Sequence, residues 1–539
     1  MFMATSKYSM IREVTEEYLK QMLSSGVIPP PEEIADEILE QEQMKFEAIN
    51  AVKPKGAKIR IPDALIPQQI ADILVRLHPI SVIELSEDVK DADNKIVAIY
   101  QEDGPNQGLY VEDDEIFIKL MKLYQYGLNK RDIEEVFACL KTTAPKRQLC
   151  KDVNLIAVNN GIFDYETKTL RAFTPDVVFL SKSRVNYNPL ATNIVLHNSD
   201  DGTDWDVESW MSDLSDDPEI VQLLWQILGA IVRPNVHWDK AAWFYSETGN
   251  NGKGTLCELM RSLTGQGTYA SIPLSDFGKD FALTKLVNSS AIIVDENDVG
   301  TYIDKAANLK AVVTGDVVQI NRKFRDPISF RFHGFMVQCL NEMPRVRDKS
   351  DSFFRRQVFI PFTKCFTGAE RKYIKHDYLH RPEVLEYVLH KVLNMDYVDL
   401  DVPESCLNAL AEYKEFNDPL RQFTSEILPE LQWDLVPFTF LYDLYKMWYK
   451  KNVGNGEVIS RKMFVKNLVN VLNDDSEFIC EDKSKKYYTG SQMDKAEPLI
   501  AEYDLKDWMN PHAAGSHDME KRCHPILQAN YRGLLRRVK

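Results

Sequence analysis

One segment near the middle of the chain constrains the fold more than any other: AAWFYSETGNNGKGTLCELMRSL, residues 241–263. An apolar run typical of a buried strand precedes a glycine-bearing loop, which leads into apolar residues at helical spacing. Strand, loop and helix in this order are typical of phosphate-binding loops, because backbone N–H groups and the helix N-terminus favour anions. The segment therefore predicts a parallel α/β core organised around this loop.

The loop itself departs from the strict phosphate-loop pattern at two positions. Glu247 stands at the first glycine position, and Gly254 stands where Ser or Thr is usual, so the Mg²⁺ hydroxyl has to come from Thr255. Lys253 supplies a point charge for the β- and γ-phosphates. The alternative is a simple turn between strand and helix. We expect ATP to be bound by Thr248, Gly249, Asn250, Asn251, Gly252, Lys253, Gly254 and Thr255.

A second motif lies 42 positions beyond Lys253, where the apolar run AIIV ends in Asp295 and Glu296. Phosphoryl transfer needs charge neutralisation and a positioned water more than covalent chemistry. Asp295 is therefore predicted to hold Mg²⁺ through water, and Glu296 to orient or deprotonate the attacking water. Taken alone, the motif has a structural alternative, because carboxylates often end strands. Its position after the glycine loop favours the catalytic interpretation.

Two further features complete the predicted site. The strand GFMVQCL ends at Asn341, a neutral donor suited to polarising the attacking water or sensing the γ-phosphate; the alternative is a strand-end turn residue. In SDSFFRRQVFIPF, Arg355 and Arg356 stand between two apolar runs. One of them is predicted to be an arginine finger, which stabilises transition-state charge across a subunit interface. The alternative is that both pair with surface acids.

A basic segment, NLKAVVTGDVVQINRKFRDPISFRF, lies between the second motif and Asn341. Cations grip a phosphate backbone and an aromatic ring stacks on bases without sequence preference, so the mix is typical of a hairpin that follows a DNA strand. The alternative is a solvated edge hairpin. The predicted DNA-contacting residues are Lys310, Arg322, Lys323, Phe324 and Arg325.

Composition limits how this protein can contact DNA and in which cellular compartment it works. With a formal net charge of -16, the chain of 539 residues is not a protein that coats nucleic acid by bulk positive charge, so its DNA contacts have to be local. The eight scattered cysteines form no C-x-x-C pair, which favours a reduced, intracellular protein. No run of about 18 apolar residues and no signal peptide is present, so we expect a cytoplasmic protein without membrane contact.

The pattern along the chain predicts several domains. Residues 1–55 read as a helical arm, either for docking or simply packed on the next domain, and residues 56–200 as a mixed α/β domain. An acidic stretch at residues 197–210 resembles an interdomain linker. Residues 201–395 carry an apolar helix and then the alternating strands and helices of the ATPase core. Residues 396–539 are mainly helical, with a final strand pair typical of a winged helix.

In their order and compact spacing, the motifs resemble the superfamily 3 helicases, specifically the phage and plasmid primase-helicase family related to the poxvirus primase-helicase. The resemblance covers about residues 150–365 and includes NNGIFDYETKTL, TGNNGKGT, IIVDEND, TGDVVQINRKF, VQCLNEMP and FFRRQVFIPF. It implies an AAA+-type core that uses ATP and Mg²⁺. Lys253 and Thr255 then bind the nucleotide, Asn341 senses the γ-phosphate, Arg356 is the preferred finger and Lys323 the preferred DNA contact.

The resemblance also implies an assembly and a role. Family members form rings, usually hexamers, that translocate on single-stranded DNA and unwind forked duplex when a phage, plasmid or mobile element begins replication in a host cytoplasm. Other replication proteins are potential partners. Residues 1–140 offer no convincing carboxylate pair for a primase, since Asp91 and Asp93 lie in a polar stretch. The alternatives are an ATP-dependent origin-binding scaffold and a nucleotide kinase, which shares the GKGT ending.

The C-terminal region contains basic residues that suit a winged helix in contact with duplex DNA. Simple solvation is the alternative for all of them. These residues are Lys462, Lys466, Lys483, Lys485, Lys486, Arg532, Arg536 and Arg537.

Overall fold

The computed structural model describes residues 6–85, 94–303, 305–323, 325–348, 350–368, 371–452, 458–472, 477–513, 516 and 518–537. The chain divides into two compact units. The first comprises Met1–Arg347 and Arg355–Cys406, and the second comprises Asp348–Phe354 and Leu407–Lys539. Asp91 and Asp93 lie outside the described residues. The predicted domain boundaries near residues 55, 200 and 395 stay predictions.

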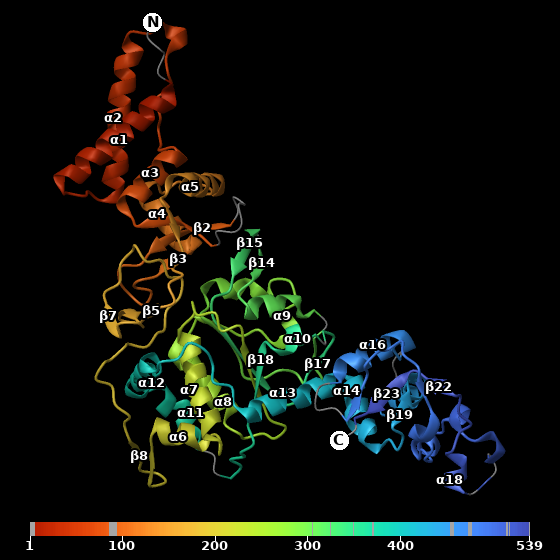
Figure 1. The fold of residues 1–539 in the computed structure, drawn as a ribbon. Helices are drawn as coiled ribbons and strands as arrows, with labels where there is room; N and C mark the ends of the chain where they lie inside the picture. The colour runs from red at the N-terminus through yellow and green to blue at the C-terminus, as the bar shows by residue number, and fades with distance from the viewer. Residues whose placement is uncertain are drawn as a thin grey trace. The chain divides into compact units, whose positions relative to one another are not determined.

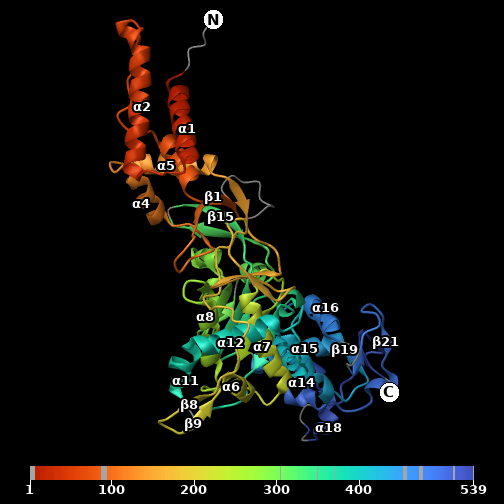
Figure 2. The same ribbon diagram turned by 90° about the vertical axis from the view of Figure 1, so that its left-hand side faces the viewer.

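The first unit begins with two long helices, α1 (Lys7–Ser25) and α2 (Pro31–Ala51), which run antiparallel side by side (Figures 1 and 2). Ser6 caps α1, and Gly26 ends it in the left-handed conformation that glycine adopts without strain. Pro31 stands at the first position of α2, where its missing N–H costs no hydrogen bond. The helical character predicted for this part of the chain is confirmed for both helices.

A small mixed sheet follows, with strand order β3-β2-β1-β4. Strands β1 and β2 pair antiparallel, and β4 adds to β1 in parallel. Helices α3, α4 and α5 pack their apolar faces against it, so α1, α2 and the sheet share one hydrophobic cluster. The elements are α3 (Pro67–Leu77), β1 (Ile80–Glu84), β2 (Lys95–Tyr100), β3 (Tyr110–Val111), α4 (Asp114–Tyr124), α5 (Lys130–Thr143) and β4 (Lys146–Gln148).

The segment NLIAVNNGIFDYETKTL forms a hairpin. Val158 pairs with Gly161 across the turn, and a third strand adds beyond it. Ile156, Val158 and Phe163 lie in the same hydrophobic core as the parallel sheet that follows. The elements are β5 (Leu155–Val158), β6 (Gly161–Asp164) and β7 (Thr169–Arg171).

The acidic stretch read as a linker is an ordered hairpin, so that interpretation was wrong for its conformation. Strands β8 (Leu196–Asn198) and β9 (Thr203–Trp205) pair across a turn in which Asn198 accepts from the backbone of Asp200. Asp206 then caps α6 (Val207–Asp213) by accepting from Ser209 N at 2.9 Å. Short Asp and Asn side chains bond their own backbone as readily in hairpin turns as in linkers.

The centre of the first unit is a parallel sheet, as the sequence predicted, and the structure gives it five strands in the order β11-β12-β16-β10-β18. Its inner strands are almost wholly buried, which explains their continuous apolar sequences. Helices α7, α8 and α12 pack on it through one large hydrophobic core (Figure 1). The elements are α7 (Pro218–Val232), β10 (Ala241–Tyr245), α8 (Lys253–Thr264), β11 (Tyr269–Ala270), β12 (Ala291–Val294), β16 (Phe335–Leu340), β18 (Gln357–Pro361), α11 (Lys372–His376) and α12 (Pro382–Asn394).

The basic segment between β12 and β16 forms helix α9 (Ala306–Val313) and an antiparallel hairpin of β14 (Val317–Arg322) and β15 (Arg325–Arg331). Val318, Ile320 and Ile328 turn one hairpin face inward. The predicted hairpin is therefore confirmed as a structural element (Figure 1).

The second unit combines helices with a three-stranded antiparallel sheet of order β19-β23-β20. Its core is rich in aromatic rings, with Phe423 packed against Tyr445, Trp448 and Phe464. The elements include α10 (Asp351–Phe354), α14 (Pro419–Ile427), β19 (Leu435–Pro437), α15 (Phe438–Asn452), α16 (Arg461–Val471), β20 (Phe478–Ile479), β21 (Tyr487–Tyr488), β22 (Asn530–Tyr531) and β23 (Gly533–Arg536), and α13 (Glu404–Asn417) spans the division between the units.

Two further facts concern the whole described chain. No helix within it is both long and apolar enough to span a bilayer. All eight cysteines are free thiols, and Cys257 Sγ lies 3.3 Å from Cys339 Sγ between α8 and β16.

Candidate nucleotide-binding site

The glycine loop lies at the carboxyl end of β10 and leads directly into α8. Asn250 and Gly252 both take left-handed backbone angles, with φ of 54° and 85°. These angles let the chain reverse within the loop before the helix begins. No side chain caps α8, whose first position follows Gly252. The Lys253 N–H donates to Asn251 Oδ1 at 3.4 Å, and the N–H groups that follow it in the first turn, together with the helix dipole, favour an anion.

A second segment braces the loop from outside. The backbone N–H of Phe366 donates to Asn250 O at 2.7 Å, and Cys365 Sγ lies 3.6 Å from Gly249 O. Within the loop, the Asn251 side chain donates to Thr248 O. Each of these contacts has a backbone carbonyl of the loop as acceptor, so together they restrain the loop backbone.

Lys253 is the most unusual charge in the site. Only 4% of its surface is exposed, and burial lowers the pKa of its ammonium. Its Nζ lies 3.4 Å from Ser246 O, and among the described residues it forms no ion pair with a carboxylate. A buried cation without a counter-charge is costly. An anion seated on the loop would supply that counter-charge.

Asp295, at the end of β12, is held by an arginine that the sequence interpretation missed. Arg261, on α8, approaches both carboxylate oxygens, at 2.8 Å to Oδ1 and 3.1 Å to Oδ2. The Arg261 hydrogen bond holds the pKa of Asp295 below its usual range, and Asp295 raises the pKa of Arg261 in turn, against the cost of burial. A bidentate pair of this kind fixes the carboxylate plane. Arg261 sits eight residues beyond Lys253, on the helix that the loop begins.

The residues predicted for Mg²⁺ fit a hard cation in part. Thr255 faces the cavity beside the loop. Each Asp295 oxygen bonds to Arg261 once and keeps a further lone pair, which suits a hydrogen bond from metal-bound water rather than direct ligation. No cluster of three or more His, Cys, Asp or Glu side chains suited to a metal occurs within the described ranges. These residues therefore fit a Mg²⁺ ion that is also coordinated by a bound anion, rather than one held by protein ligands alone.

A buried polar network fixes the turn that follows the two carboxylates. Asn297 Nδ2 donates to Gln338 Oε1 and to Cys339 O, both at 3.0 Å. Its Oδ1 accepts from Leu274 N at 2.9 Å. Because β12 and β16 are neighbours, this amide ties the ends of both strands together. The signal was present in the sequence, as a glutamine inside an otherwise apolar strand.

We expect Asn297→Ala to lower the free energy of unfolding of this unit by about 1–3 kcal/mol, because three buried partners lose their hydrogen bonds. The measurement is calorimetric unfolding of the full chain. The relevant transition is the one whose midpoint temperature rises when nucleotide is added. Asn341→Ala is the matched control. Its amide is exposed, so it should change stability by less than about 0.5 kcal/mol. Equal effects of the two changes would remove the structural role from Asn297.

Glu296 and Asn341 stand at the same edge as the loop. Both side chains are exposed. Within the described chain Glu296 has neither a hydrogen bond nor an ion pair in its side chain, unlike the preceding Asp295. Leu340 O accepts from Ser246 N at 3.1 Å, which brings the end of β16 beside the start of the loop. The structure thus gathers Lys253, Thr255, Asp295, Glu296 and Asn341 at the carboxyl ends of adjacent parallel strands, where α/β proteins bind ligands.

Arg355 and Arg356 lie at the opposite edge of the sheet. They precede β18, which runs parallel to β10 with Gln357 beside Ala241 and Pro361 beside Tyr245. Five residues of strand span about 16 Å, so neither arginine approaches the loop of its own chain. The carbonyl oxygens of both bond to the start of β10, from Lys240 Nζ and Ala241 N. The Arg355 side chain is exposed, whereas Arg356 is half-buried.

The predicted DNA-contacting residues divide into different environments. Arg322 is only 14% exposed and pairs with Glu112 at 3.0 Å, so its charge is neutralised within the protein, and its contact with DNA stays a prediction. Lys323 is exposed at the hairpin turn, and Lys310 lies on α9. Arg325 begins β15. Phe324 lies outside the described residues.

The basic residues of the second unit also divide. Lys462 and Lys466 are exposed one helical turn apart on α16. Arg536 is instead structural, because it pairs with Asp434 at 3.1 Å and also with Glu477. Lys485 pairs with Glu481 at 3.2 Å on the surface. Lys483, Lys486, Arg532 and Arg537 are exposed.

Fold and site together define a class: a multidomain α/β protein with a glycine-bearing loop and a carboxylate pair at the carboxyl edge of a parallel sheet. Three protein families match the chain. Residues 68–228 match the "D5 N terminal like" family, residues 415–507 the "Poxvirus D5 protein-like" family, and residues 244–356 a family of unknown function, DUF5906. Two of these three families are D5-like, which confirms the resemblance found in the sequence to a family related to the poxvirus protein.

Individual relatives are distant. A protein of Acanthamoeba polyphaga mimivirus that carries a helicase name is 23% identical over 240 residues, which is 43% of this chain and 23% of the relative. The match thus spans about a quarter of that protein. Solved apo structures of the NrS-1 C-terminal region are 12% identical, with TM-scores of 0.42 and 0.39; they cover 88% and 83% of this chain and 100% and 93% of theirs. The family and the mimivirus relative support an enzyme of helicase type.

Proposed function

We propose that this protein is an ATP-dependent replicative DNA helicase of a virus, phage, plasmid or other mobile element. In this proposal it assembles as a hexameric ring and moves on single-stranded DNA. The observation that carries the proposal is Lys253. It is a buried cation without a carboxylate partner in the described chain, at the uncapped start of α8. The phosphates of a nucleoside triphosphate would neutralise the Lys253 charge, because phosphates bind favourably at a helix N-terminus.

Hydrolysis is assigned to the polar groups around the loop. A water attacks the γ-phosphorus while the bond from that phosphorus to the bridging oxygen of ADP breaks, and the water's proton passes to Glu296. Lys253 neutralises the phosphates, and Asn341 donates to the γ-phosphate or to the water. Mg²⁺, held by Thr255 and through water by Asp295, supplies further charge neutralisation when bound. The products are ADP and phosphate.

The arginine finger is assigned to a neighbouring copy. Arg355 and Arg356 lie at the sheet edge opposite the loop, so each supports catalysis only at another subunit's site. Such an arrangement couples hydrolysis to assembly, since neither copy holds a complete site alone. This is the physical reason for proposing a homo-oligomer.

DNA contacts are assigned to both units. Lys323, at the exposed hairpin turn, is the proposed contact with the translocating strand, and Lys310 lies on the preceding helix. In the second unit, the order α14, β19, α15, α16, β20, β23 and the sheet order β19-β23-β20 support a winged helix. Its second helix after β19 is α16, which exposes Lys462 and Lys466 and would lie in the major groove.

The proposal is tested by ATP-dependent displacement of a strand from a forked duplex. Glu296→Gln is expected to lower kcat for hydrolysis by about 10² or more, because a positioned general base contributes that much. It should leave the affinity for a nonhydrolysable ATP analogue unchanged and should abolish displacement. Glu219→Gln, at an exposed carboxylate in the first turn of α7, is the matched control with normal activity.

Two outcomes would replace the proposal. If the intact protein binds ATP and assembles on DNA without displacing a strand, it is an assembly scaffold. If it transfers phosphate to a nucleoside monophosphate without stimulation by DNA, it is a nucleotide kinase.

A further inference from the structure

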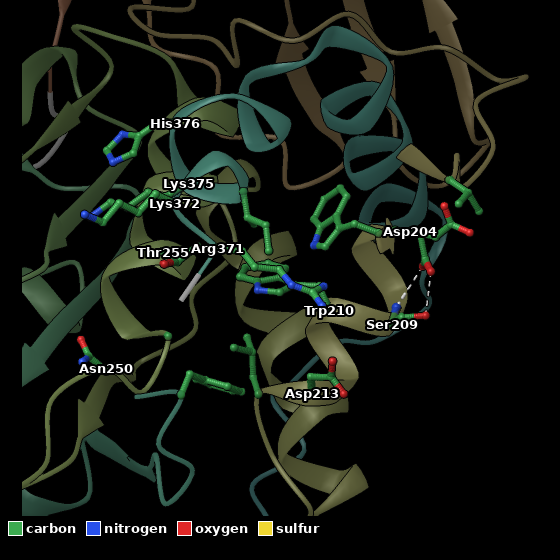
Figure 3. A pocket seen from close by; sticks show the side chains of 17 residues that line it. Asp204, Ser209, Trp210, Asp213, Asn250, Thr255, Arg371, Lys372, Lys375 and His376 are labelled. Atoms are coloured by element: carbon green, nitrogen blue, oxygen red, sulfur yellow. Dashed lines mark hydrogen bonds between the residues drawn. The ribbon is translucent and has the colours of Figure 1, made fainter. Parts of the chain in front are cut away.

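A cavity of about 690 Å³ opens directly beside the glycine loop, and the family motifs leave it unexplained. Its volume is typical of pockets for nucleotide-sized ligands. One wall is the start of α8, with Gly252 and Thr255. The second is the β9–α6 segment, and the third is the segment from Phe366 to His376 (Figure 3). The cavity therefore joins three stretches of chain that lie far apart in the sequence.

The wall formed by β9 and α6 presents two indole rings. Trp210, on α6, lines the cavity and is half-buried. Trp205 lies beneath it, with ring centroids 6.4 Å apart, and is 6% exposed. The Trp205 indole N–H is buried and donates to no described residue. An aromatic face beside an unused donor suits a planar heterocycle that carries ring nitrogens as acceptors.

The opposite side of the cavity is cationic. Arg371, Lys372 and Lys375 line it from the α11 segment (Figure 3). Lys375 comes closest to the loop, since a side-chain carbon added at Gly254 would lie 3.6 Å from Lys375 Nζ. Its ammonium therefore stands over the first turn of α8. After the Arg261 hydrogen bond, the charge of Lys375 is a further cause that lowers the pKa of Asp295.

Several contacts hold this cationic segment in place. Tyr373 OH donates to Asp201 at 2.8 Å, in the β8–β9 hairpin. His380 Nδ1 lies 3.1 Å from Ser262 Oγ on α8. The hairpin and α8 thus fix α11 from both sides. Because the segment is anchored before any ligand arrives, its charges are preorganised for an anion at the loop.

We propose that this cavity holds the base and sugar of the bound nucleoside triphosphate, with the base stacked on Trp210 and Lys375 acting as a second phosphate-binding cation beside Lys253. The inference rests on the proposed function and deepens it, because it assigns the nucleotide's orientation. The base points toward α6, and the phosphates lie between the loop and α11. Lys375 binds phosphate and takes no part in proton transfer.

The test measures the affinity of the full-length protein for two probes by titration calorimetry with Mg²⁺ present: a nonhydrolysable ATP analogue and inorganic tripolyphosphate. Trp210→Ala should weaken the analogue about tenfold and leave tripolyphosphate unchanged, because only the analogue carries a base. Trp210→Phe should restore most of the affinity. Lys375→Met should weaken both probes by about the same factor of ten.

Lys364→Met is the matched control. Lys364 lies two residues before that segment, pairs with Asp216 at 2.8 Å and is not part of the cavity lining, so neither probe should be affected. The inference is overturned if Trp210→Ala changes neither probe, or changes both equally, or if Lys375→Met changes neither. A different result would indicate that the proposed ATP-dependent function itself is wrong: the wild type would then bind the ATP analogue no better than Lys253→Ala does.

Discussion

Lys253→Ala is expected to lower kcat/KM for ATP hydrolysis by about 10³ or more and to abolish strand displacement. The physical reason is that Lys253 is buried and lacks a carboxylate partner in the described chain, so its charge is committed to the ligand. Alanine leaves the triphosphate with the helix dipole and N–H groups alone. The measurement is steady-state phosphate release with and without single-stranded DNA, together with binding of the ATP analogue.

The control for this change is Lys279→Ala. Lys279 is 64% exposed and pairs with Asp276, so its removal should leave hydrolysis unchanged. If Lys253→Ala hydrolyses ATP at the wild-type rate, the loop is only a turn between strand and helix. The proposal of an ATP-dependent helicase then fails.

Loss of the arginine finger is the second large effect. We expect Arg356→Ala to lower DNA-stimulated hydrolysis by about 10³ while ATP binding persists, because the finger acts on transition-state charge. Arg355→Ala is the natural comparison, since Arg355 is the more exposed of the two side chains. If only Arg355→Ala loses activity, Arg355 is the finger.

Mixing tests whether the finger acts between copies. The arginine variant keeps an intact loop, and Lys253→Ala keeps an intact arginine. When the two inactive proteins are combined, some interfaces pair a sound loop with a sound arginine, so hydrolysis should reappear. Activity that stays absent in every mixture, with assembly intact, would place the finger's role within one chain and contradict the geometry of the parallel sheet.

Much of the central fold was predictable, because its signals are local. The apolar run AIIV and the run FMVQCL, apolar except for Gln338, indicated buried parallel strands, and the glycines and Lys253 indicated a loop that leads into a helix. The hairpin of residues 317–331 followed from the same kind of pattern. These predictions hold because hydrophobic periodicity and glycine conformation depend on neighbours along the chain.

Other features escaped the sequence because their partners lie far away in it. The acidic stretch at residues 197–210 folds into a hairpin whose Asp201 receives Tyr373. Arg322 looked like a DNA contact but pairs with Glu112, 210 positions earlier. The sequence around Asp201 does not indicate that Tyr373 is its partner, and the sequence around Arg322 does not indicate Glu112. Charge alone could not separate a ligand-facing arginine from one bound within the protein.

The sequence by itself determined the family resemblance and the order in which the glycine loop, the Asp295–Glu296 pair and Asn341 follow apolar strands, since each motif is encoded within a few adjacent residues. Only the tertiary structure decided which groups meet: Arg261 on Asp295, Asn297 on Gln338, and Lys375 over the start of α8. These contacts depend on tertiary packing. Burial of the sheet and its helices brings side chains from distant segments to within a few ångströms of one another.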